Sequence, residues 1–173
     1  MDINRITSKY VAAEDRFGLS GVDAEGRALV LWLTQRLLNR LVSALCRGLE
    51  KHNSQSQRAD VLGGLRSQIE QGFAQQKAMA NLAHNAPVTA PVGAAQWRVD
   101  AVDIVQGVGG VRLTFKGSCD AERAALVLSA TALRQWLTIL FSQYRQAGWS
   151  THAWPVWMEH SEGAGKDKAI SLH

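Results

Sequence analysis

The feature of this sequence that most constrains its fold is a strand pattern that becomes a helix pattern at a single residue. Leucines alternate with Val30 and Trp32 over residues 29–33, which predicts a β-strand with one face in a core. Over residues 37–49 apolar residues recur at steps of three and four, as on one face of an α-helix. Thr34 lies at the change of period, where its hydroxyl can accept a bond from a first-turn N–H. Thr34 is therefore the predicted N-cap.

The same pattern returns in the second half of the chain, at residues 126–144. Without a gap, Leu33 aligns with Leu128 and Thr34 aligns with Ser129, so Ser129 is a second predicted N-cap. Any two strand-to-helix units could share such a pattern. However, each copy is also preceded by two strand-like runs separated by turns rich in Gly and Asp. The sequence therefore predicts an internal duplication, in which each half reads strand, strand, strand, helix.

Short turns of this composition are hairpin connections, so neighbouring strands are predicted to be antiparallel. The expected fold is α+β, with two βββα repeats related by pseudo-two-fold symmetry and antiparallel sheet(s) packed against helices. The strands would form either one six-stranded sheet or two three-stranded sheets. The predicted strand runs are 6–11, 16–20 and 29–33, then 97–105, 111–116 and 126–129.

Composition shifts divide the chain into five segments. The predicted segments are a first half (1–52), a middle amphipathic helix (53–84), a Pro- and Ala-rich linker (85–96), a second half (97–149) and a tail (150–173). The last dozen residues of the tail are expected to be disordered.

The middle helix has an apolar side but weak intrinsic stability. Gly63, Gly64 and Gly72 each cost about 1 kcal/mol relative to Ala in a helix interior. Such a helix must draw its stability from packing, either against its own chain or against another subunit. The residues that share its apolar side are Val61, Leu62, Leu65, Ile69, Phe73, Ala80 and Ala83.

Composition indicates a globular protein, because 46% of the residues are hydrophobic and 20% are charged. The chain shows neither the apolar run of a signal peptide nor a stretch long enough to span a membrane, so we expect a cytoplasmic protein with no membrane partner. Cys46 and Cys119 are isolated, which fits reduced thiols in that compartment.

Three of the six tryptophans, Trp149, Trp154 and Trp157, lie within nine positions of the tail. Tryptophans are enriched as anchors at protein interfaces, so one interpretation is a docking segment for a partner. The alternative is that the tail folds back and closes the core of its own chain.

A second candidate is a stripe of cations in the first helix. Arg36, Arg40, Arg47 and Lys51 fall within a narrow arc of the helix surface. Four cations in a row can neutralise phosphates or attract an acidic partner. A charged helix face is also the ordinary solvated side of a helix, and the formal net charge of +4 is spread along the chain.

No catalytic or metal-binding signature is present. The sequence has no Gly-x-Ser-x-Gly, no phosphate-binding loop and no Gly-x-Gly-x-x-Gly that opens a helix. Strand-like runs flank the glycines of residues 107–110, which predicts a hairpin turn. No catalytic residue, metal site or cofactor is predicted. The histidines His52, His84, His152, His160 and His173 lack metal-ligand spacing.

The absence of these motifs favours a non-enzymatic protein that acts in protein–protein interaction, self-association or assembly as an accessory subunit. The alternative is a nucleic-acid-binding module that uses the cationic helix face. A second alternative is a small-ligand binder or enzyme whose site lies between the two halves.

Overall fold

The computed structural model describes residues 1–54, 61–82 and 86–159 of the chain and has two mixed sheets of four strands each. One sheet has the order β2 (Arg5–Val11), β3 (Arg16–Val22), β4 (Ala28–Leu33), β5 (Ala95–Arg98). The other has the order β1 (Asp2–Ile3), β8 (Arg123–Ser129), β7 (Gly110–Lys116), β6 (Ala101–Gly107).

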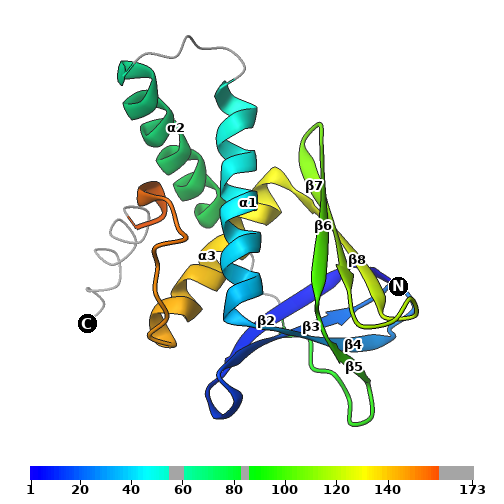
Figure 1. The fold of residues 1–173 in the computed structure, drawn as a ribbon. Helices are drawn as coiled ribbons and strands as arrows, with labels where there is room; N and C mark the ends of the chain where they lie inside the picture. Colours follow the sequence, from blue (N-terminus) through cyan, green and yellow to red (C-terminus); the bar gives the residue numbers. More distant parts are fainter. Residues whose placement is uncertain (55–60, 83–85, 160–173) are drawn as a thin grey trace, which may run out of the picture.

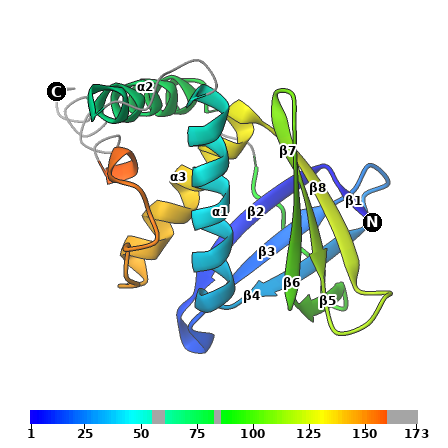
Figure 2. The same cartoon turned by 45° about the horizontal axis from the view of Figure 1, so that its top comes forward.

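Helices α1 (Gln35–Ser54), α2 (Val61–Ala80) and α3 (Ala130–Gln146) lie together on one side of the sheets, and α2 is the farthest from them (Figures 1 and 2). A 3-10 turn, η1 (Ala12–Glu14), connects β2 to β3. Residues 156–159 form one further helical turn. The α+β class is confirmed. Over the described residues, no helix combines the length and the apolar composition that a membrane span requires.

Each sheet contains strands from both halves of the chain. Neighbouring strands pair antiparallel within a half, as predicted, but β4 pairs in parallel with β5 and β8 pairs in parallel with β1. The expectation of purely antiparallel sheets with three or six strands is therefore wrong. The pseudo-two-fold relation of the halves stays a prediction.

Each sheet has four strands and not three because the chain crosses from one sheet to the other at two places. Asn4 separates β1 from β2, and its N–H donates to the carbonyl of Val22. The predicted strand 97–105 is divided at residues 99–100. There the N–H of Val99 bonds to Trp32 in one sheet and the N–H of Asp100 bonds to Lys116 in the other. In addition, β5 begins at Ala95, within the predicted linker.

Both predicted helix caps are confirmed. The hydroxyl of Thr34 accepts a hydrogen bond from the N–H of Leu37 at 3.3 Å, and that of Ser129 accepts one from Ala132 at 3.1 Å. The predicted hairpin turn also forms between β6 and β7. Its Gly109 has φ 89°, a left-handed conformation that glycine adopts without a steric cost.

The inner faces of the two sheets and the apolar faces of α1 and α3 form one core. Each fully buried Leu or Phe contributes about 1.5–3 kcal/mol relative to an exposed position. Among the largest fully buried side chains are Phe17, Leu31, Leu38, Leu113, Phe115, Leu137 and Tyr144.

Candidate interaction surface

The three tail tryptophans are buried in the core. The indole of Trp154 packs edge-on against Phe141 at 5.0 Å between ring centroids. The indole N–H of Trp149 donates to Asp15 at 2.8 Å, and that of Trp157 donates to Glu50 at 3.0 Å. Of the two interpretations, this arrangement favours the one in which the tail closes the core of its own chain. It does not favour a docking segment for a partner.

The four cations predicted to share one face of α1 do so. Arg36, Arg40, Arg47 and Lys51 are all exposed, whereas the opposite face of the helix is buried. The structure thus brings these side chains together as a solvated stripe.

Helix α2 presents its apolar side to solvent, contrary to the usual arrangement. Leu65, Ile69 and Phe73 are 58%, 57% and 67% exposed. We call these three residues the α2 stripe. The described part of the predicted apolar side therefore does not pack within the chain. The side chains of Val61 and Leu62, and all of Ala83, lie outside the described residues.

The side of α2 that packs against the rest of the chain is polar. Gln71 and Gln75 have no exposed surface. The amide of Gln71 donates to the carbonyl of Leu49 in α1 at 3.1 Å, and the amide of Gln75 donates to the carbonyl of Arg134 in α3 at 2.8 Å. The Gln75 amide also donates to the hydroxyl of Thr138 at 2.5 Å. Two glutamines four residues apart therefore join α2 to both neighbouring helices.

A buried arginine completes this network. The guanidinium of Arg134 donates to the side-chain oxygens of Gln71 and Gln75, and its Cζ lies over the ring of Trp157, 5.6 Å from the ring centroid. Within the described residues its hydrogen bonds end on amide or backbone oxygens and not on a carboxylate. Burial lowers the pKa of Arg134, since it disfavours the charged form. We call Gln71, Gln75, Arg134 and Thr138 the polar network.

The polar network fixes the rotation of α2 about its axis. A rotation that turned the α2 stripe inward would carry both glutamines into water and leave the Arg134 guanidinium buried without partners. A buried charge without partners costs several kcal/mol. The exposed position of the α2 stripe therefore follows from the hydrogen bonds on the opposite side of the helix.

Sequence reasoning missed this network, although one signal pointed to it. The side of α2 opposite the stripe has no charge, whereas a solvated helix face usually carries several. Its residues are Ser67, Gln71, Ala74, Gln75 and Ala78. The charges of the described part of α2, Arg66, Glu70 and Lys77, lie on one flank of the stripe instead.

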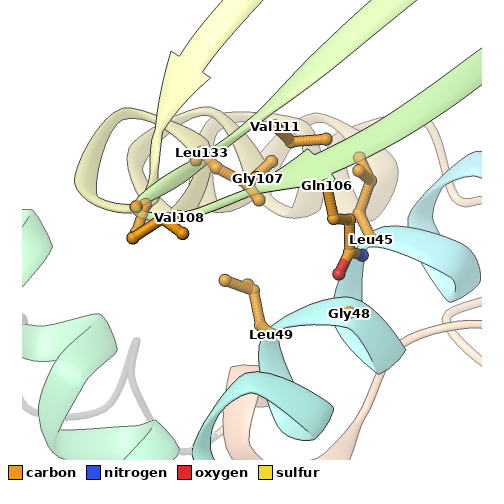
Figure 3. A pocket seen from close by; sticks show the side chains of 11 residues that line it. Leu45, Gly48, Leu49, Gln106, Gly107, Val108, Val111 and Leu133 are labelled. Carbon is orange, nitrogen blue, oxygen red and sulfur yellow. The ribbon is translucent and has the colours of Figure 1, made fainter.

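A cavity of about 360 Å³ opens between α1, the β6–β7 hairpin and the start of α3 (Figure 3). The amide of Gln106 lies over Gly48, where a Cβ would come within 1.7 Å of it. The apolar walls of the cavity come from both halves of the chain and are formed by Leu45, Leu49, Val108, Val111 and Leu133.

Over residues 1–54, 61–82 and 86–159, no three His, Cys, Asp or Glu side chains group as metal ligands would. Comparisons of the chain with protein-family models, with curated proteins and with solved structures give no match. The interpretation of the surface therefore depends on its own geometry.

Proposed function

We propose that this protein is a non-enzymatic interaction or assembly protein and that the α2 stripe is the surface on which a protein partner docks. The observation that carries the proposal is the outward orientation of Leu65, Ile69 and Phe73 on a helix whose rotation is fixed by a satisfied polar network. Without such a network, a helix would be expected to bury its apolar side, because removing apolar surface from water is favourable.

The size of the α2 stripe supports this function. The three side chains expose about 300 Å² of apolar surface, the range in which a patch on a monomer is often functional. At about 25 cal/mol per Å², covering that surface is worth about 7.5 kcal/mol before the costs of association. Helix-to-groove and helix-to-helix recognition use side chains at this same spacing of four residues.

Site-specific photocrosslinking in cells tests the proposal. A benzoylphenylalanine replaces Phe73, and the control carries it at Val127, which is 62% exposed on the outer face of β8. We expect a covalent adduct with a protein from position 73 and none from position 127. If position 73 gives no adduct of any mass, the α2 stripe is not a docking surface.

A nucleic-acid-binding function is the second candidate, and the exposed cations of α1 favour it. Four positive side chains on one helix face would contact phosphates without reading sequence. Binding to a generic oligonucleotide should then weaken steeply between 50 and 200 mM salt, and Arg40→Ala should reduce the slope by about one. Failure to bind at low salt removes this candidate.

A small-ligand site is the third candidate, and the cavity of Figure 3 favours it because α1 and the β6–β7 hairpin come from different halves. A compact apolar ligand should bind less tightly after Leu133→Trp fills the cavity.

The equivalent positions of the two parallel pairings, β4 with β5 and β8 with β1, support the proposed pseudo-two-fold repeat. The cytoplasmic location stays a prediction.

A further inference from the structure

We infer that the partner of the α2 stripe is the α2 stripe of a second copy of this chain, with the two helices antiparallel. This inference rests on the proposed docking function and adds the identity and the orientation of the partner. It follows from the spacing of the stripe, the charges beside it and the side of α2 on which the body of the molecule lies.

The spacing of the α2 stripe makes it complementary to itself. Leu65, Ile69 and Phe73 are each four residues apart, so they follow one another along one face of α2. If a two-fold axis passes beside Ile69, this residue meets its own copy, and Leu65 meets the Phe73 of the second chain. The large ring is then opposite the smaller side chain at both ends.

The charges of α2 select the antiparallel arrangement. Arg66 and Glu70 lie on one flank of the stripe, where the guanidinium of Arg66 pairs with the Glu70 carboxylate at 3.1 Å. In an antiparallel pair this flank faces the same flank of the second copy. Glu70 then lies about 3 Å along the axis from the second chain's Arg66. In a parallel pair the same charges would face an uncharged flank that contains Gln68 and Gly72.

The described part of the molecule leaves room for a second copy. Gln71 and Gln75 attach α2 to α1 and α3 on the side away from the stripe. Figures 1 and 2 show α2 at the periphery of the helical layer. A Cβ at Gly72 would meet no heavy atom within 4 Å, so packing within the chain does not require this glycine. Its missing side chain would allow another helix to approach closely.

The area of the α2 stripe predicts a weak dimer. Two stripes bury about 600 Å² together, well below the roughly 1,600 Å² of a standard stable interface. The flanking polar side chains add to this area. We therefore expect a dimer that forms at micromolar concentrations and dissociates on dilution, as seen by sedimentation velocity or light scattering over a hundredfold concentration range.

Cysteine crosslinking tests the partner and the orientation together. The background is Cys119→Ser, because Cys119 is exposed, whereas Cys46 is buried and burial raises its pKa to about 12. We expect Ile69→Cys to form a disulfide-linked dimer on mild oxidation. We also expect Leu65→Cys mixed with Phe73→Cys to crosslink at least several-fold more than Leu65→Cys alone. Equal self-crosslinking of all three variants would indicate parallel helices and overturn the orientation.

A charge exchange provides a test that does not depend on oxidation. Arg66→Glu and Glu70→Arg should each weaken self-association about tenfold, because like charges then face each other on the shared flank. A mixture of the two variants should associate as heterodimers at least as well as the unaltered chain. Mixing cannot restore the Arg66–Glu70 pair within one helix, so recovery of association in the mixture would come from charges that face each other across the interface. Failure of the mixture to associate overturns the inference.

The failure of this inference is distinguishable from the failure of the proposed function. If the chain stays monomeric up to several hundred micromolar and Ile69→Cys gives no dimer, the second copy is excluded as partner. A photocrosslink from position 73 to a protein of another mass would then retain the docking function. The stripe residues are exposed, so their cysteine variants should keep the melting temperature of the background.

Discussion

At the scale of single residues, Arg134 has the greatest consequence for the candidate surface. It is a buried cation whose partners are neutral oxygens of Gln71 and Gln75, so it depends on α2 for its hydrogen bonds. Conversely, α2 depends on Arg134 to keep its glutamines satisfied. This dependence couples the orientation of the α2 stripe to one residue in another helix.

Replacing Arg134 by Met should lower the free energy of unfolding by about 2 kcal/mol, because the oxygens of Gln71 and Gln75 stay buried without donors. Urea denaturation followed by tryptophan fluorescence measures the change. The matched control is Arg112→Met, which removes a surface pair with Asp2 and should cost less than about 1 kcal/mol. Equal losses in the two variants would contradict a special role for Arg134.

Asp15 should make stability depend on pH. Its carboxylate accepts bonds from the hydroxyl of Tyr10 and the indole of Trp149, and these bonds hold its pKa below the ordinary value. Because the folded pKa is lower than the unfolded one, the contribution is complete above the ordinary carboxyl pKa and is lost as the pH falls through the lowered value. Urea midpoints of the native chain and Asp15→Asn should therefore differ most at pH 6 and converge towards pH 2. A constant difference would contradict this assignment.

At the scale of elements, the local signals were sufficient for the beginnings of α1 and α3 and for the β6–β7 turn. Thr34, Ser129 and the glycines of residues 107–110 act on backbone groups a few positions away, so sequence alone reveals them. The orientation of α2 was not predictable in this way. An apolar side shows that a helix has a preferred face, but it does not show whether that face lies inside the same chain.

The division of strand 97–105 was missed for a similar reason. Alternation continues through Val99 and Asp100, while the bend depends on which strands lie on either side. Trp32 and Lys116 supply the bonds at the bend, and both are remote in sequence. The buried pairing of Gln71 and Gln75 with Arg134 is likewise a contact between distant segments.

Ser129→Ala should lower the free energy of unfolding by about 1 kcal/mol, because the N–H of Ala132 loses its acceptor at the start of α3. Thr34→Ala should have an effect of similar size on α1. Thermal unfolding followed by circular dichroism measures both. Ser129→Asp should retain most of the stability, since a carboxylate can accept the same bond. Loss of the same stability in Ser129→Asp would show that the cap is not the cause.

At the scale of the whole molecule, the aromatic segment after α3 is an integral part of the core. A chain that ends at Trp149 lacks Trp154, Trp157 and Met158, all of which are buried. Removing one large buried aromatic side chain typically costs 3–5 kcal/mol, so we expect this truncation to unfold or aggregate. A chain that ends at Glu159 keeps all three and is the control. Light scattering and circular dichroism compare the two, and a folded, monodisperse shorter chain would contradict the prediction.

The parallel pairing of β1 with β8 has a consequence for synthesis. Asp2 and Ile3 lie opposite Ala125 and Leu126, so during translation β1 must wait for a partner strand that lies 123 positions further along the chain. On the ribosome, the nascent first half can form its β2–β3–β4 hairpins early, yet the edge that β8 will occupy stays open until that strand emerges. We therefore expect the nascent protein to be most prone to aggregation before the second sheet is complete, and a chaperone would bind most readily in that interval.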